Sequence, residues 1–124
     1  DCCDNFPTRF AVNASCVRRS KPLVSGAAIR MEGQVSVFDG RDPNSPCYQC
    51  LYQEGRDDET CSANGVMSPV VGIIGSLQAM EAIKIISNVG RTLTGRLLLL
   101  DASTSQWREM RLPKDLNCEV CRAS

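Results

Sequence analysis

Two pairs of cysteines are the residues of this chain whose type and spacing could do chemistry. They are Cys47 with Cys50 and Cys118 with Cys121, and the sequence contains no histidine. Two thiolates spaced in this way on a tight turn supply half of a tetrahedral zinc shell. The two pairs together therefore predict one structural zinc ion, which connects distant segments and closes a long loop of chain. Two disulfides, or redox-active pairs, are the alternatives that the spacing leaves open.

The composition is that of a globular chain. Of its residues, 43% are hydrophobic and 23% are charged, and the net charge is zero. A length of 124 residues is enough to bury the hydrophobic core of one domain. Because Lys and Arg are scattered, we expect neither nucleic acid nor a membrane as a partner. The longest apolar stretch, residues 69–89, carries Glu81 and Lys84 and is not expected to span a membrane. High aliphatic content and the lack of a signal-peptide pattern favour the cytoplasm over a secreted disulfide scaffold.

The elements that must position the cysteines are predicted to be a helix, two strands, a second helix and two more strands. Pro7 suits the first turn of a helix that runs to about Arg19 and that Asp4 or Asn5 would cap. Residues 23–29 are apolar and small, which suits a buried parallel strand, whereas residues 32–39 alternate like a strand with one wetter face. The remaining predicted elements are a long helix at 69–90 and a hairpin of strands at 96–101 and 106–112.

The long helix is apolar almost all round in its first half. Such a helix needs burial on more than one side. Gly72, Gly75 and Ser76 lower its helix propensity, so we expect them to allow another backbone to approach closely.

Several short motifs follow one another along the chain and together carry a resemblance. They are Arg9, the two cysteine pairs, and residues 1–5 (DCCDN), 22–27 (PLVSGA), 32–34 (EGQ) and 75–84 (GSLQAMEAIK). In this order they resemble the C-terminal half of the bacterial ubiquitin-activating-like adenylyltransferases. The likeness implies an α/β fold, the C-terminal half of a Rossmann-like activating enzyme: a mixed sheet with a long buried helix and a four-cysteine zinc staple. Residues 1–124 would form the C-terminal portion of one adenylyltransferase domain, without its glycine-rich ATP-binding half.

The resemblance also implies a reaction. Such enzymes use ATP and Mg to adenylate the C-terminal glycine of a ubiquitin-fold sulfur-carrier protein, and a sulfur-donor protein then acts on the adenylate. Metal and cationic groups absorb the charge that develops on the phosphates. We prefer the branch that serves molybdopterin synthesis, with the thiamin branch as the alternative because residues 105–108 (SQWR) resemble it. The family further implies a homodimer, with contacts near Val71, Ile74 and Leu77. Residues 1–124 alone are expected to be inactive.

Three residues of the first helix region match the nucleotide side of the family's site. Asp4 falls on the aspartate that contacts metal and ATP at the carboxyl end of a strand, where α/β sheets place ligands. Asn5 would be its neighbour on the nucleotide, and Arg9 lies on the same helix face. A plain helix cap is the alternative for Asp4, and a structural ion pair is the alternative for Arg9.

Of the other four cysteines, one is a candidate for a chemical role and three are expected to have none. Cys61 aligns with a cysteine that, in some family members, bonds covalently to the carrier; it follows a polar segment at 54–59 that we expect to be a mobile loop. A loop thiol without a role is the alternative for Cys61. Cys2, Cys3 and Cys16 are expected to be core thiols.

Two functions from other classes stay open at this point. One is a non-catalytic, zinc-stapled protein-interaction module, in which Asp4 would only cap a helix. The other is a thiol–disulfide protein that uses Cys47 and Cys50.

Overall fold

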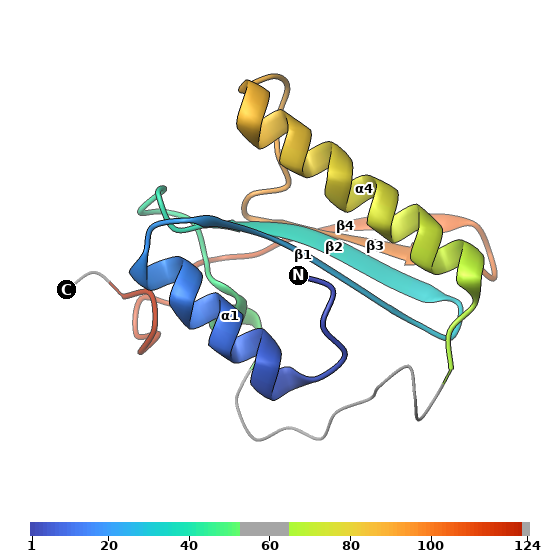
Figure 1. The fold of residues 1–124 in the computed structure, drawn as a ribbon, viewed down its shortest axis with the longest axis horizontal. Helices are drawn as coiled ribbons and strands as arrows, with labels where there is room; N and C mark the ends of the chain where they lie inside the picture. Colours follow the sequence, from blue (N-terminus) through green and yellow to red (C-terminus); the bar gives the residue numbers. More distant parts are fainter. Residues whose placement is uncertain (53–64, 123–124) are drawn as a thin grey trace.

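The computed structural model describes residues 1–52 and 65–122 (Figure 1). The helices and strands lie close to the ends predicted from the sequence, and one short helix in the first cysteine turn was not predicted. In chain order they are α1 (Phe6–Arg18), β1 (Pro22–Ile29), β2 (Glu32–Asp39), α2 (Tyr48–Leu51), α4 (Ser68–Ser87), β3 (Arg96–Asp101) and β4 (Gln106–Arg111).

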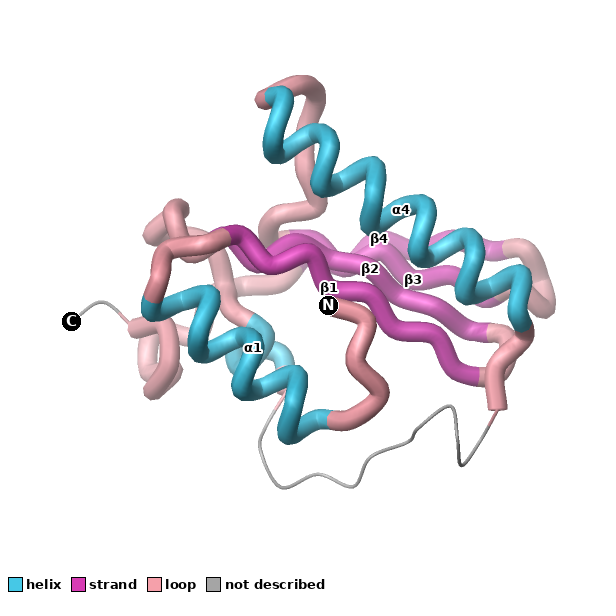
Figure 2. Tube along the Cα trace, in the orientation of Figure 1, coloured by secondary structure: helices cyan, strands magenta, loops and turns pink. Residues whose placement is uncertain are grey.

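The four strands form one antiparallel sheet in the order β1-β2-β3-β4 (Figure 2). The sequence predicted a mixed sheet and a parallel strand at 23–29; among these four strands the pairing is antiparallel throughout. The other edge of β1 carries the parallel pattern instead. There the nitrogen of Asp1 donates to the Val24 carbonyl at 2.6 Å, and the Gly26 N–H donates to the Asp1 carbonyl at 3.2 Å. The backbone just before α1 thus lies beside β1 as a parallel neighbour would.

Helices cover both faces of the sheet (Figure 1). On one face, Phe10 of α1 packs with Leu23 of β1 and Phe38 of β2. On the other face, the side chains of α4 cover Val35 and Val37 of β2. Because β2 alternates between two covered faces, it has no wetter side, and the prediction of one is wrong.

Close packing between α4 and the sheet depends on glycines of the strands. A Cβ at Gly33 would lie 2.5 Å from Cγ1 of Ile74, and a Cβ at Gly26 would also collide with a side chain of α4. By contrast, a Cβ at Gly72 or Gly75 would meet nothing within 4 Å. The sequence predicted that the glycines of the helix would allow a close approach of another backbone. Within one chain, the glycines that allow close packing are instead those of the strands, Gly26 and Gly33.

The helix α4 is buried along one side only. Val70, Ile74 and Glu81 face the sheet, whereas Val71 is 48% exposed and Ile83 is 56% exposed. The long buried helix predicted from the sequence is thus half covered in the single chain. By length and composition α4 could also cross a membrane, but here it packs on β1 and β2.

Candidate functional site

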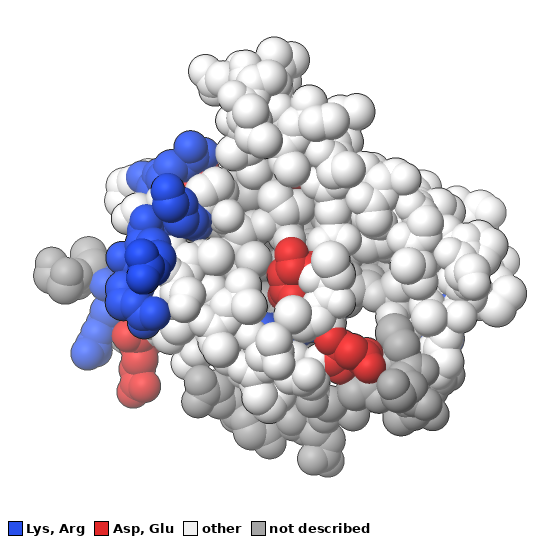
Figure 3. Space-filling model, viewed as in Figure 1, with Lys and Arg blue, Asp and Glu red and all other residues white. Residues whose placement is uncertain are grey.

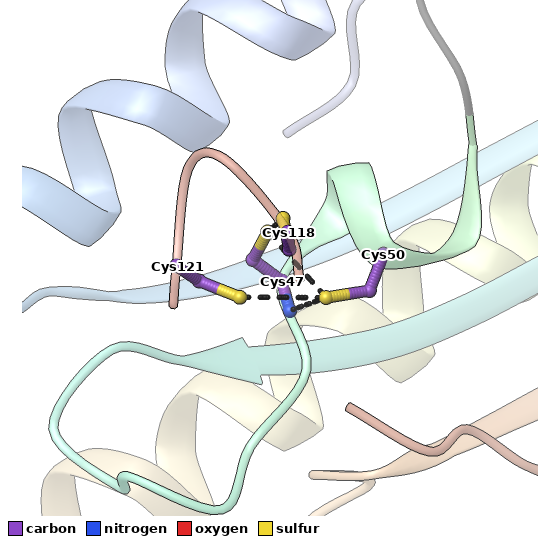
Figure 4. Close-up of side chains that lie close together, drawn as sticks. All are labelled: Cys47, Cys50, Cys118 and Cys121. Atoms are coloured by element: carbon purple, nitrogen blue, oxygen red, sulfur yellow. Dashed lines mark hydrogen bonds between the residues drawn. The ribbon is translucent and has the colours of Figure 1, made fainter. Parts of the chain in front are cut away.

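The four cysteines predicted as zinc ligands lie together (Figure 4). The sulfur–sulfur distances are 3.7 Å between Cys47 and Cys118, 3.9 Å between Cys47 and Cys50, and 3.4 Å between Cys50 and Cys121. All four sulfurs lie within 4.8 Å of one another. A zinc tetrahedron with Zn–S bonds of about 2.3 Å has edges of about 3.8 Å. These thiols match such a tetrahedron and are too far apart for disulfides, whose S–S bonds measure about 2.05 Å.

Each pair sits on a tight turn that aims both sulfurs at the same point. Cys47 caps the start of α2, and its backbone N–H donates to the Cys50 sulfur at 3.4 Å. In the second turn, the N–H of Cys118 donates to the Asp115 carbonyl at 3.1 Å, and the N–H of Arg122 donates to the Cys118 carbonyl at 3.0 Å. The two turns predicted from the spacing are therefore both present.

Ionisation of all four clustered thiols is unfavourable unless a cation is bound among them. Burial raises the pKa of the Cys47 thiol. Burial and the neighbouring sulfurs of Cys50 and Cys47 raise the pKa of Cys121 strongly. Burial opposes ionisation of Cys118 as well, but backbone N–H groups of the same turn outweigh it and lower the pKa of that thiol. Four thiolates cannot share this volume without a positive charge, and the soft donor set suits Zn²⁺.

A separate pocket of about 1030 Å³ opens beside the N-terminus of α1, the first residues of α4 and the strands β1 and β2. It holds Asp4, Asn5 and Arg9 together, and none of the four clustered cysteines lines it. Acidic side chains lie between α1 and α4 on the face shown in Figure 3, whereas Lys and Arg gather where α1 ends. The structure thus groups the predicted nucleotide-side residues in one place and the predicted metal ligands in another.

Asn5 is the N-cap residue of α1. The Asn5 side chain accepts a hydrogen bond from the Thr8 N–H at 2.9 Å, which satisfies a free amide of the first turn of α1. Asp4 is exposed on the pocket wall. Of the two residues that the sequence offered for the cap, Asn5 thus takes the N-cap position.

Arg9 makes the structural ion pair that the sequence left open. Its guanidinium lies 3.2 Å from the Asp1 carboxylate and donates to the carbonyl oxygens of Gly26, at 3.2 Å, and Cys3. The side chain of Arg9 is 11% exposed, and that of Asp1 is fully buried. Arg9 thereby ties the backbone just before Asp4 to β1 while it lines the pocket.

Sequence reasoning missed several polar residues of the pocket. Gln78 of α4 donates to the Asp1 carbonyl at 2.7 Å, and Gln34 of β2 donates to the Tyr52 hydroxyl. Arg108 of β4 lines the same pocket. Gln78 directly follows the apolar first half of α4, and a polar residue at such a position was the signal that could have revealed it.

The remaining cysteines do not all behave as predicted. Cys16 packs partly buried against the core, as expected. Cys2 is exposed and Cys3 is half-buried, so the prediction of a core thiol is wrong for Cys2. Both lie on the segment before α1, which passes beside the edge of β1, and both line the pocket. Cys61 lies outside the described residues.

Comparison with known proteins matches nearly the whole chain to one family model. The model of the ThiF family matches residues 1–120. The chain is 52% identical over 122 residues to the molybdopterin-synthase adenylyltransferase of Salmonella typhimurium and 51% identical to that of Escherichia coli, covering 98% of this chain and 49% of each relative. It is 45% identical over 127 residues to the adenylyltransferase and sulfurtransferase MOCS3 of Drosophila yakuba, covering 99% of this chain and 28% of that relative. The chain thus spans about half the length of the bacterial relatives.

The fold agrees with a solved structure at low sequence identity. The crystal structure of Escherichia coli MccB with MccA-N7isoASN superposes with a TM-score of 0.79 at 18% identity, covering 99% of this chain and 40% of that one. The Rossmann-like fold class expected from the sequence is therefore confirmed. The family model matches residues 1–120 of this chain, and the two bacterial relatives are 52% and 51% identical to it. This chain therefore belongs to the ThiF family.

Proposed function

We propose that residues 1–124 form the C-terminal portion of one adenylyltransferase domain. The full-length protein would adenylate the C-terminal glycine of a ubiquitin-fold sulfur-carrier protein, for sulfur transfer in molybdopterin synthesis. Support comes from the ThiF family and from relatives named molybdopterin-synthase adenylyltransferase. Because these relatives are about twice as long, we infer that the ATP-binding half lies in the chain before Asp1.

The position of Asp4 is the observation that carries this proposal. Its carboxylate stands on the wall of a large pocket at the end of a backbone segment that Arg9 and β1 hold in place. Asn5 caps the helix, so the capping of α1 does not require Asp4. When bound, ATP and Mg²⁺ supply the AMP group and neutralise phosphate charge. Asp4 would hold the metal, and Asn5 and Arg9 would line the nucleotide side.

The same pocket suits an extended glycine-rich tail. Gly26 and Gly33 lie along it, and side chains able to hydrogen-bond a peptide backbone border it, among them Gln34 and Arg108. A tail lying there would bring its terminal carboxylate towards Asp4. A sulfur-donor protein would then act on the adenylate, and Cys61 is a candidate for a covalent step.

Three further features complete the proposal. The four-cysteine cluster would hold structural zinc, since its sulfur spacing and thiolate chemistry fit that ion. The exposed side of α4, with Val71 and Ile83, would form part of a homodimer contact. The cytoplasm is the proposed compartment because thiolate ligands must stay reduced.

Carrier-dependent exchange of radioactive pyrophosphate into ATP tests the function. The full-length protein should catalyse exchange with a molybdopterin-type carrier and much more slowly with a thiamin-type carrier. The opposite preference would place the protein in the thiamin branch. Absence of exchange with either carrier, in zinc-loaded protein, would refute adenylation and leave the interaction-module alternative.

A further inference from the structure

Asn13 of α1 is a buried amide beside the cysteine cluster. It is 1% exposed and lies on the side of α1 that faces α2. Its Oδ1 accepts a hydrogen bond from the Tyr48 N–H at 2.9 Å. Its Nδ2 makes no hydrogen bond to any residue that the structure describes. A buried amide donor without a partner costs about 1–3 kcal/mol, so an unfilled donor here needs a reason.

The orientation of this amide is fixed by its neighbour. Exchanging Oδ1 and Nδ2 would turn a donor towards the Tyr48 N–H, which is itself a donor. Tyr48 directly follows Cys47 in the chain. Asn13 and Cys47 line the same small cavity, and the Asn13 side chain partly offsets the burial that raises the pKa of the Cys47 thiol.

A thiolate on a metal is a much better acceptor than a neutral thiol. Four thiolates around Zn²⁺ carry two net negative charges, and N–H donors that reach the sulfurs spread this charge. The donor left unfilled beside the Cys47 thiol would therefore find its acceptor when the metal is bound.

We propose that Asn13 is a positioning residue of the metal centre, with Nδ2–H donating a hydrogen bond to the metal-bound Cys47 sulfur. This inference rests on the proposed zinc site. It also ties the metal centre to α1, the helix whose first turn borders the pocket of Asp4.

Full-length protein labelled with ¹⁵N and loaded with ¹¹³Cd tests the bond directly. We expect a scalar coupling between the cadmium and an Asn13 Nδ2 proton, transmitted through the sulfur. A cavity of about 170 Å³ also borders Asn13. An amide bonded to water in that cavity would show no coupling, and this result with cadmium bound would overturn the proposal. Cadmium that does not bind the cysteines at all would instead refute the metal site.

Two variants provide a second test. Asn13→Asp keeps the oxygen that the Tyr48 N–H needs and places an oxygen where the donor was, facing the thiolate. Zinc affinity, measured by competition with a chromogenic chelator, should fall by about 10- to 100-fold. Phe10→Leu is the matched control, because Phe10 is buried in the same helix and makes no polar contact with the cluster. It should lower the Tm and leave zinc affinity unchanged; equal affinity losses in both variants would reduce Asn13 to a packing role.

Discussion

Gln78 of α4 donates a hydrogen bond from Nε2 to the carbonyl oxygen of Asp1 at 2.7 Å. The bond ties the long helix to the backbone three residues before Asp4, across the outer edge of β1. It exists because residue 26 is glycine: a Cβ there would lie 2.3 Å from Cδ of Gln78. The segment that presents Asp4 is thus supported from α4 by Gln78 and from α1 by Arg9.

Gly26→Ala should expel the Gln78 amide and loosen the support of Asp4. We expect carrier-dependent pyrophosphate exchange by the full-length protein to fall at least ~10-fold, because small displacements of catalytic groups are costly. The free energy of unfolding should fall by only about 1 kcal/mol for the lost hydrogen bond. Gln78→Ala should have the same effect, and the double variant should be no worse than Gln78→Ala alone. Additive losses would show that Gly26 acts by another route.

Asp4→Ala should remove activity and leave stability intact. We expect exchange to fall at least ~100-fold, because the variant removes the proposed metal-holding carboxylate. Asn5→Ala is the matched variant one residue along; it should lower the free energy of unfolding by about 1 kcal/mol, because Asn5 caps α1. Thermal melts and exchange rates of both proteins separate the two roles. Normal exchange by folded Asp4→Ala protein would contradict the catalytic assignment.

Zinc removal should invert the dependence of stability on pH. In metal-free protein, burial holds the pKa values of Cys47 and Cys121 above their ordinary values. As the pH rises, these thiols therefore lose their protons in the unfolded chain before they do so in the folded chain. The free energy of unfolding keeps its full value below about pH 8.5 and decreases as the pH rises further. In zinc-loaded protein, protons compete with the metal for the thiolates, and stability falls towards acidic pH. Melting curves measured across pH should show the Tm of the metal-free protein falling at alkaline pH and that of the zinc-loaded protein falling at acidic pH. A fall of both Tm values at the same end of the pH range would argue against metal ligation.

Ile83→Glu should convert the proposed dimer into a monomer. Ile83 is 56% exposed on the outer side of α4, so the charge should disrupt association with little effect on the Tm. Ile74 cannot serve this purpose, since it is 3% exposed and packs against Gly33. Sedimentation equilibrium of the full-length protein measures the result. A monomer before substitution would refute the dimer proposal.

The sequence predicted the elements and the gathering of the four cysteines well, for physical reasons. Cysteine spacing reports the geometry of a turn directly, and the hydrophobic periods of 2 and 3.6 report strands and helices. Pairing direction was not predictable, because small apolar residues such as those of β1 suit parallel and antiparallel neighbours alike. The roles of Asp4 and Asn5 could not be separated either, since both residues favour the helix cap and one hydrogen bond decides between them.

The four proposed zinc ligands come from two segments that lie 71 residues apart. During translation, Cys47 and Cys50 leave the ribosome long before Cys118 and Cys121 exist. The complete tetrahedron therefore becomes available only after every strand of the sheet has been synthesised. Chains interrupted before Cys121 would lack a full set of ligands, so, with the proposed zinc, retention of the ion would distinguish finished chains from truncated ones.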